Sequence, residues 1–148
     1  MVSETGYKGI GGLLIILGVL LALMSWYIFP VCEVQGSFVE TKAGMKLPMT
    51  CGYSARAENG IGALVALTGI VLFFRSTRET RQILGVIDVA LGLFAILTPT
   101  VIIGMCRLAD HPCRTTTLPG LELLGAIIVI VGLFLFFVKD QVAAAGTT

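Results

Sequence analysis

The strongest constraint on this sequence is that four long apolar stretches make up most of its length. We predict that each stretch forms one membrane-spanning helix, at about residues 9–30, 55–75, 82–105 and 119–138. About 20 apolar residues suffice to cross a bilayer core of roughly 30 Å. Only 13% of the 148 residues are charged, against about 25% in an ordinary soluble domain. The composition therefore excludes a soluble fold.

These spans predict an all-α integral membrane four-helix bundle that forms a single domain over residues 1–148. The first span is expected to stay in the mature protein, because its apolar region is longer than the roughly 7–15 residues of a signal peptide. The second span is short as a purely apolar run. It reaches full length if its helix begins near Ala55 and carries Arg56 and Glu58 into the interface, where long side chains can extend toward water.

Arginine density predicts the orientation of the spans. Three arginines fall within residues 75–81, beside two span ends, which is typical of a cytoplasmic turn. The opposite side also carries basic residues, so charge alone does not decide. All four cysteines lie on that opposite side, where disulfides persist if the compartment is oxidising. We therefore expect both termini in the cytoplasm and the cysteine-bearing loops outside it.

The sequence contains an internal repeat, in which each copy is one helical hairpin. An offset of 74 residues places Gly11, Gly18 and Cys32 on Gly85, Gly92 and Cys106. An offset of 63 residues places Gly62 and Gly69 on Gly125 and Gly132. Both hairpins start on the same side, so the repeat is parallel.

Each span holds one pair of glycines seven residues apart, and seven residues correspond to two turns at 3.5 residues per turn. Such a stripe lets two helix backbones approach closely in a membrane. We predict that all eight glycines lie at helix interfaces: Gly11, Gly18, Gly62, Gly69, Gly85, Gly92, Gly125 and Gly132.

Three acidic residues share these stripes. Asp88 is three residues from Gly85, Glu58 is four from Gly62, and Glu122 is three from Gly125, so all three should point toward helix contacts. Glu58 and Glu122 are near the outer interface and could meet arginine or water there. Asp88 is deeper, which favours a structural or partner contact over a transport site; an unpaired charge there costs about 2.5–3.5 kcal/mol.

The four cysteines allow three disulfide connectivities. The repeat favours pairing within each hairpin, Cys32–Cys51 and Cys106–Cys113, and a pairing across the hairpins remains open. A soft metal site for copper or zinc is the alternative. Its ligands would be Cys106, His111 and Cys113, with Met49 and Met105 nearby.

Two segments carry a resemblance to a known family. Residues 48–62 hold a Pro-Met-x-Cys motif, and residues 99–119 hold two cysteines separated by six residues. They resemble an uncharacterised family of small bacterial membrane proteins with four spans, catalogued only as a domain of unknown function. The sequence departs from that family's pattern at Gly52 and His111, which alters any metal site that the family implies. The resemblance implies a bacterial plasma membrane location and an association with exporter permeases.

The sequence as a whole predicts a non-enzymatic membrane protein without a cofactor. It lacks the common nucleotide-binding and hydrolase motifs, and no basic run interleaved with aromatics suggests nucleic acid binding. The expected partners are the lipid bilayer and either other membrane subunits, as in an export system, or further copies of the chain. Outer-face thiol or metal handling is the second hypothesis, and a small transporter that uses Asp88 is the third.

Overall fold

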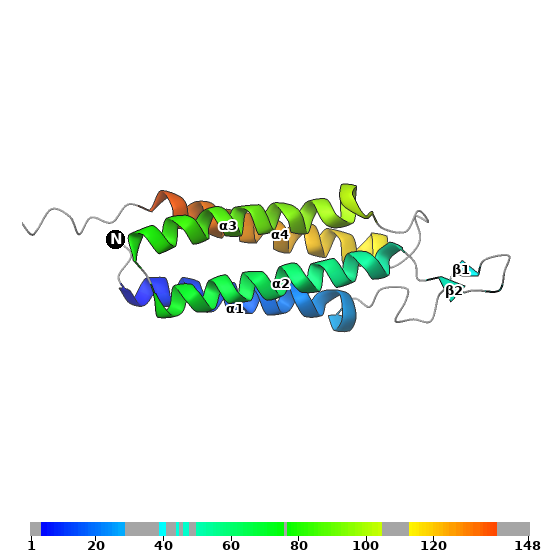
Figure 1. Cartoon of the computed structure of the whole chain (residues 1–148), viewed down its shortest axis with the longest axis horizontal. Coiled ribbons are helices and arrows are strands. Elements are labelled where there is room, and N and C mark those ends of the chain that lie inside the picture. Colours follow the sequence, from blue (N-terminus) through cyan, green and yellow to red (C-terminus); the bar gives the residue numbers. More distant parts are fainter. Residues whose placement is uncertain are drawn as a thin grey trace, which may run out of the picture.

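The computed structural model describes residues 4–28, 39–40, 44, 46–47, 50–75, 77–104 and 113–138. Four helices run lengthwise beside one another (Figure 1). They are α1 Glu4–Leu23, α2 Thr50–Phe74, α3 Arg78–Leu97 and α4 Leu118–Phe137. Three short π-helical segments adjoin them, namely η1 Met24–Ile28, η2 Thr98–Ile102 and η3 Cys113–Thr117. A small antiparallel pair, β1 Val39–Glu40 and β2 Lys46–Leu47, lies beyond one end of the helices.

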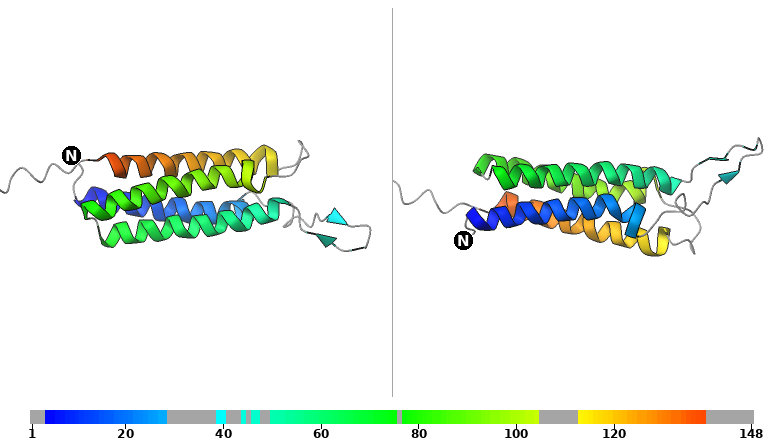
Figure 2. Two further views of the ribbon diagram at one scale, coloured as in Figure 1. Left: turned by 45° about the horizontal axis from the view of Figure 1, so that its top comes forward. Right: turned by 90° about the horizontal axis from the view of Figure 1, so that it is seen from below.

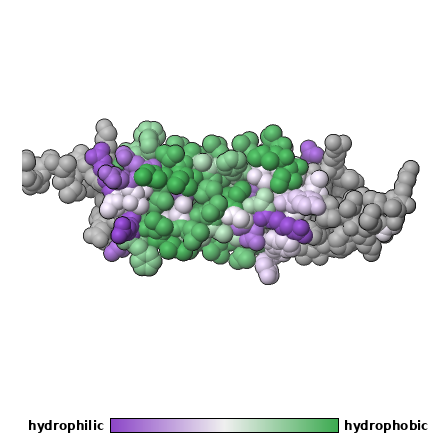
Figure 3. All heavy atoms as spheres, in the orientation of Figure 1, coloured by the Kyte–Doolittle hydropathy of each residue, from purple (hydrophilic) through white to green (hydrophobic). Residues whose placement is uncertain are grey.

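All four helices are long and apolar enough to cross a membrane. The candidate spans are Gly6–Leu23, Thr50–Phe74, Arg78–Ile102 and Cys113–Phe137. The surface of the described residues is hydrophobic along the middle of the bundle and more hydrophilic toward its two ends (Figure 3). The prediction of a helical, multi-pass membrane protein is therefore confirmed.

The two ends of the bundle differ in chemistry. At one end, which we call the arginine end, α2 is followed by Arg75 and α3 begins at Arg78. At the other, which we call the cysteine end, Cys51 lies in the first turn of α2, and Cys113 is the first residue of η3, which precedes α4. Helix α2 begins at Thr50, five residues before the predicted start, because its first turns pack into the bundle.

The buried positions of the helices follow a spacing of four and three residues in alternation. On α3 this series is Arg81, Gly85, Asp88, Gly92 and Ala95, with Leu84 buried beside it, and on α4 it is Leu121, Gly125, Ile128, Gly132 and Leu135. This spacing averages about 3.5 residues, which keeps one seam of each helix against its neighbours and is typical of left-handed supercoiling.

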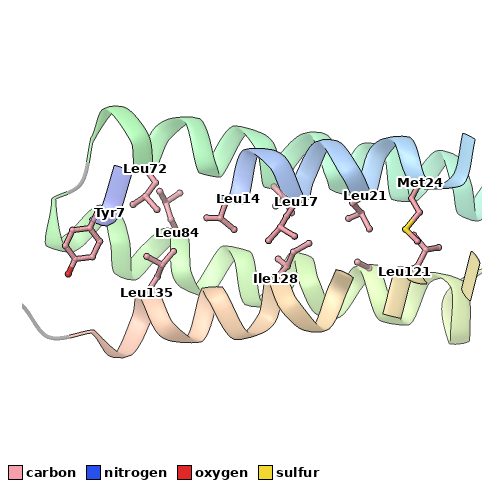
Figure 4. Packing of buried hydrophobic residues seen from close by; sticks show 12 residues of the cluster. Tyr7, Leu14, Leu17, Leu21, Met24, Leu72, Leu84, Leu121, Ile128 and Leu135 are labelled. Carbon is pink, nitrogen blue, oxygen red and sulfur yellow. The ribbon is translucent and has the colours of Figure 1, made fainter. Parts of the chain in front are cut away.

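The helices pair closely as two antiparallel hairpins. Most contacts lie within the α1–α2 pair and within the α3–α4 pair, and fewer join α2 to α3 and α1 to α4. Figure 2 shows the same pairing from two other directions. Larger side chains fill the space between the hairpins, where Leu14, Leu17 and Leu21 of α1 face Leu121 and Ile128 of α4 (Figure 4).

The third span widens where its sequence reaches Pro99. The carbonyl oxygen of Thr98 accepts hydrogen bonds from the backbone nitrogens of Ile103, at 3.0 Å, and Gly104, at 3.2 Å. These bonds span five and six residues instead of the usual four, which makes this turn wider. Pro99 itself has no N–H to donate to the carbonyl oxygen four residues before it, and its ring crowds that turn. Gly104 then ends the segment at a φ of 83°, a left-handed conformation that favours glycine.

Candidate functional site: buried polar groups between two hairpins

The glycine stripes of α1 and α2 face each other inside the first hairpin. A Cβ atom added to Gly11 would lie 2.9 Å from the carbonyl oxygen of Gly69, and one added to Gly18 would lie 2.6 Å from that of Gly62. Neither position can hold a side chain without moving a backbone. The absence of a side chain is therefore what lets these two helices approach so closely.

The second hairpin has the same arrangement. A Cβ atom on Gly85 would lie 2.8 Å from the carbonyl oxygen of Gly132, and one on Gly92 would lie 2.8 Å from that of Gly125. These four glycines occupy the positions related by offsets of 74 and 63 residues to those of the first hairpin. All eight predicted interface glycines thus face another helix of this chain, so these stripes are not free for another protein.

Asp88 lies between the hairpins. Its side chain is fully buried, and its Oδ1 atom is 2.6 Å from the hydroxyl of Thr68 on α2. The same hydroxyl is 2.7 Å from the carbonyl oxygen of Val65. The second carboxyl oxygen, Oδ2, is buried and has no hydrogen-bond partner among the described residues. Asp88 therefore contacts a neighbouring helix of its own chain.

Glu58 is also fully buried, and neither of its carboxyl oxygens has a hydrogen-bond partner within the described part of the chain. The expected contact with arginine or water near the outer interface therefore has no arginine partner among the described residues, and it stays a prediction. Arg56 is exposed, and its guanidinium lies over the Tyr53 ring at 5.9 Å. Positions 56 and 58 differ by about 200° around a helix of 3.6 residues per turn, so they occupy opposite faces.

The third acid, Glu122, is half-buried at the cysteine end of α4. It precedes Gly125 by three residues, and Gly125 packs against Gly92. The structure therefore does not bring the three acids into one cluster. Glu58 and Asp88 are buried at separate depths, and Glu122 has partial access to the surroundings.

A buried arginine completes the polar groups between the hairpins. Arg81 is 5% exposed, and its guanidinium lies 3.9 Å from the centre of the Tyr7 ring. A cation over an aromatic face is attracted by the ring quadrupole, so this contact joins α3 to α1 at the arginine end. Our sequence reasoning counted Arg81 only as a loop charge. Arg81 lies four residues before Gly85 and seven before Asp88, and this spacing could have indicated that it shares their buried face.

At the cysteine end, Ser54 is buried and donates a hydrogen bond of 3.0 Å to the carbonyl oxygen of Gly104. This bond ties the start of α2 to the end of the widened third span. Thr98 and Thr117 are buried as well, and Thr98 donates to the carbonyl oxygen of Phe94 at 2.7 Å. Polar side chains thus occur between the helices from one end of the bundle to the other.

The structure describes two of the four cysteines. Cys51 and Cys113 are both fully buried at the cysteine end, whereas Cys32 and Cys106 lie outside the described residues. Both proposed disulfides include one of those two residues, so both stay predictions. His111, Met49 and Met105 also lie outside the described part. Within that part, no group of three or more His, Cys, Asp or Glu side chains could hold a metal ion.

Comparison with known proteins places the chain in a family. Residues 14–138 match a family described as a domain of unknown function, DUF4418. No curated protein matches the chain, and no solved structure does. The match covers more than four fifths of the sequence, with the second half of α1 and all of α2, α3 and α4, so the chain belongs to the DUF4418 family.

Proposed function

We propose that this chain is a non-enzymatic integral membrane protein of the bacterial plasma membrane. It acts as an accessory or assembly subunit of a larger membrane complex, such as an export system, or as an oligomer of identical chains. The arginine end faces the cytoplasm, with both termini, because arginines beside span ends are retained on that side. The cysteine end faces outward, where the predicted disulfides Cys32–Cys51 and Cys106–Cys113 can persist.

The observation that carries this proposal is a small, polar patch on the outward face of α2. Asn59, Gly60 and Ala63 are all exposed, and a Cβ atom on Gly60 would meet no atom within 4 Å. They lie inside a candidate span, where a helix of another protein can cover them. Toward the arginine end the same face carries larger exposed side chains, Leu67 and Phe74.

An asparagine facing lipid leaves amide groups without partners, whereas a neighbouring helix can satisfy them. Hydrogen bonds of this kind contribute about 0.6–2 kcal/mol between membrane helices, and small residues beside them let the backbones approach. Asn59 also lines a pocket of about 380 Å³ together with Ala22, Leu23, Trp26 and Tyr27. A side chain from a partner helix would fit between α1 and α2 at this point.

The test replaces two residues of the patch with larger side chains. The double variant Asn59→Leu with Gly60→Leu should lose co-purification of the partner from native membranes in mild detergent, or lose self-association measured by energy transfer between labelled chains. The matched control is Ala126→Leu, because Ala126 is also exposed, on α4. If the wild-type chain is a lone monomer, or if both variants associate as well as wild type, the subunit proposal is wrong.

Each of the two alternative functions is supported by one observation. Cys51 and Cys113 are buried at the same end of the bundle, which suits thiol or metal handling with Cys106 and His111. Metal analysis and thiol counting on the purified protein test this idea, and four unreactive sulfurs with no metal would end it. The buried carboxyl of Asp88 suits a small transporter. A solute flux in proteoliposomes that Asp88→Asn leaves unchanged would remove that alternative.

We also propose that the two hairpins descend from one duplicated unit. The matching glycine contacts support this, because residues at constant offsets make the same contact in each hairpin. The paired aromatic residues at the ends of α2 and α4 support it too: Phe73–Phe74 and Phe136–Phe137 are both edge-to-face pairs, with ring centres 5.6 and 5.2 Å apart.

A further inference from the structure

The contact between Asp88 and Thr68 constrains the number of hydrogens at the site. The hydroxyl oxygen of Thr68 is 2.6 Å from Oδ1 of Asp88 and 2.7 Å from the carbonyl oxygen of Val65. Both distances are those of hydrogen bonds between oxygens. A threonine hydroxyl has a single hydrogen, so it can donate to only one of these two oxygens.

If Asp88 were ionised, all three oxygens would share the one hydrogen of Thr68. Either the Val65 carbonyl or the carboxylate would then face the hydroxyl oxygen at hydrogen-bond distance with no hydrogen between them. If Asp88 carries a proton, each of the two contacts has its own hydrogen. The carboxyl O–H donates to the oxygen of Thr68, and the hydroxyl of Thr68 donates to the carbonyl oxygen of Val65.

The surroundings of Asp88 supply little to stabilise a negative charge. Asp88 lies three and four residues from the glycines of its stripe. The buried residues between the glycine pairs of the other three helices are Leu14, Leu17, Val65, Thr68 and Ile128, and Thr68 is the one polar residue among them. The nearest basic residue on its own helix is Arg81, two turns away, and its guanidinium lies over the ring of Tyr7.

The other carboxyl oxygen points to the same conclusion. Oδ2 is buried without a hydrogen-bond partner among the described residues. A carboxylate spreads its charge over both oxygens, and a buried charged oxygen without a donor is far costlier than a neutral one. A carboxylic acid needs a partner chiefly for its O–H group, which Thr68 provides.

We infer that Asp88 is a resident proton-binding site, a neutral carboxylic acid that donates its hydrogen to Thr68 in the interface between the two hairpins. The ligand is a single proton, and Thr68 is the positioning residue. The hydrogen-bonded series runs from α3 through Asp88 and Thr68 to the backbone of α2, so it links the hairpins. A proton on Asp88 is relevant to the alternative that this chain is a transporter, but the inference holds whether or not the protein transports a solute.

Infrared spectroscopy of the full-length protein in lipid bilayers at neutral pH tests the inference. The chain contains three aspartates, Asp88, Asp110 and Asp140, so labelling aspartate side-chain carboxyls with ¹³C separates them from every glutamate. We expect one labelled carboxylic acid band that shifts in heavy water. If all three labelled aspartates give only carboxylate bands, the inference is overturned. This arm uses the wild-type chain, so it does not depend on the folding of any variant.

Two variants assign the band. Asp88→Asn should remove it, whereas the same band surviving in a folded Asp88→Asn protein would place the proton on another aspartate and overturn the inference. Thr68→Val should keep the band but shift it to higher frequency, because the O–H group loses its acceptor. A band that does not move in Thr68→Val would contradict the hydrogen bond. Glu79→Gln, which alters an exposed acid on the same helix, should leave it unchanged.

Discussion

Adding one methyl group to Gly62 should destabilise the protein, whereas adding it two residues earlier, at Gly60, should not. A Cβ atom on Gly62 would lie 2.6 Å from the carbonyl oxygen of Gly18 and 2.7 Å from the backbone nitrogen of Ala22, against ordinary contacts of 3.4 Å or more. Both contacts are with backbone, which cannot rotate away. The two helices would have to separate by most of an ångström along their closest contact.

The magnitude follows from two opposing terms. Forcing a methyl group into a well-packed interface costs about 1–3 kcal/mol, and replacing glycine with alanine in a helix contributes roughly 1 kcal/mol of stability. Gly62→Ala should therefore be destabilising by up to about 2 kcal/mol. Gly60→Ala meets no atom within 4 Å and should gain up to roughly 1 kcal/mol.

The assay is reversible unfolding in mixed micelles with increasing denaturing detergent, followed by circular dichroism. The two variants change the same residue type on the same helix, at nearly the same position along its axis. The difference between their free energies of unfolding therefore isolates the contact with α1. A Gly62→Ala protein as stable as Gly60→Ala would refute the packing of the first hairpin. The corresponding change in the second hairpin is Gly132→Ala, whose Cβ atom would lie 2.8 Å from the carbonyl oxygen of Gly85.

Three further changes probe the polar groups between the hairpins. In a double-mutant cycle on unfolding, Tyr7→Leu and Arg81→Gln should show a coupling of about 1–2 kcal/mol, since the cation lies over the ring in a buried site; additive effects would contradict the contact. Glu58→Met should raise the free energy of unfolding by about 1–3 kcal/mol, because it removes buried oxygens that have no partner among the described residues; a loss of stability would reveal a partner for Glu58. Ser54→Ala should cost about 1 kcal/mol through its lost bond to Gly104, and an unchanged unfolding curve would argue against that bond.

The four helices and the close approach between them could be predicted from the sequence, because both depend on local patterns. Apolar length predicts the spans, and the seven-residue glycine spacing predicts a close approach. The sequence could not tell which helix each stripe faces. That depends on where the antiparallel pairs align, and it became clear only from the contacts of Gly18 with Gly62 and of Gly92 with Gly125.

The polar groups were harder to predict, because a charge in a sequence carries no information about its depth. Glu58 and Asn59 are neighbours, yet Glu58 is fully buried and Asn59 is exposed. Counting four residues back from Gly62 placed Glu58 on the interface but did not separate partial from complete burial. Arg81 was taken for a loop charge because the apolar stretch begins after it. The partnership of Asp88 with Thr68 joins two helices, and no local pattern encodes it.

Cross-linking in native membranes tests the central claim that these spans pack as hairpins with glycine-lined interiors. In a chain without other reactive cysteines, Ala95→Cys with Gly125→Cys should form a disulfide, because a Cβ atom on Gly125 lies 3.5 Å from that of Ala95, close to the mean of about 3.8 Å in disulfides. The position of Gly125 is crowded most closely by a side chain that can move, Cγ1 of Ile96 at 2.7 Å, and its nearest backbone atom, the Gly92 carbonyl oxygen, is 3.0 Å away. The control pair, Ala90→Cys with Ala126→Cys, uses exposed positions on the same two helices and should stay reduced within one chain. Efficient intramolecular cross-linking of the control pair, with none for the first pair, would contradict the account.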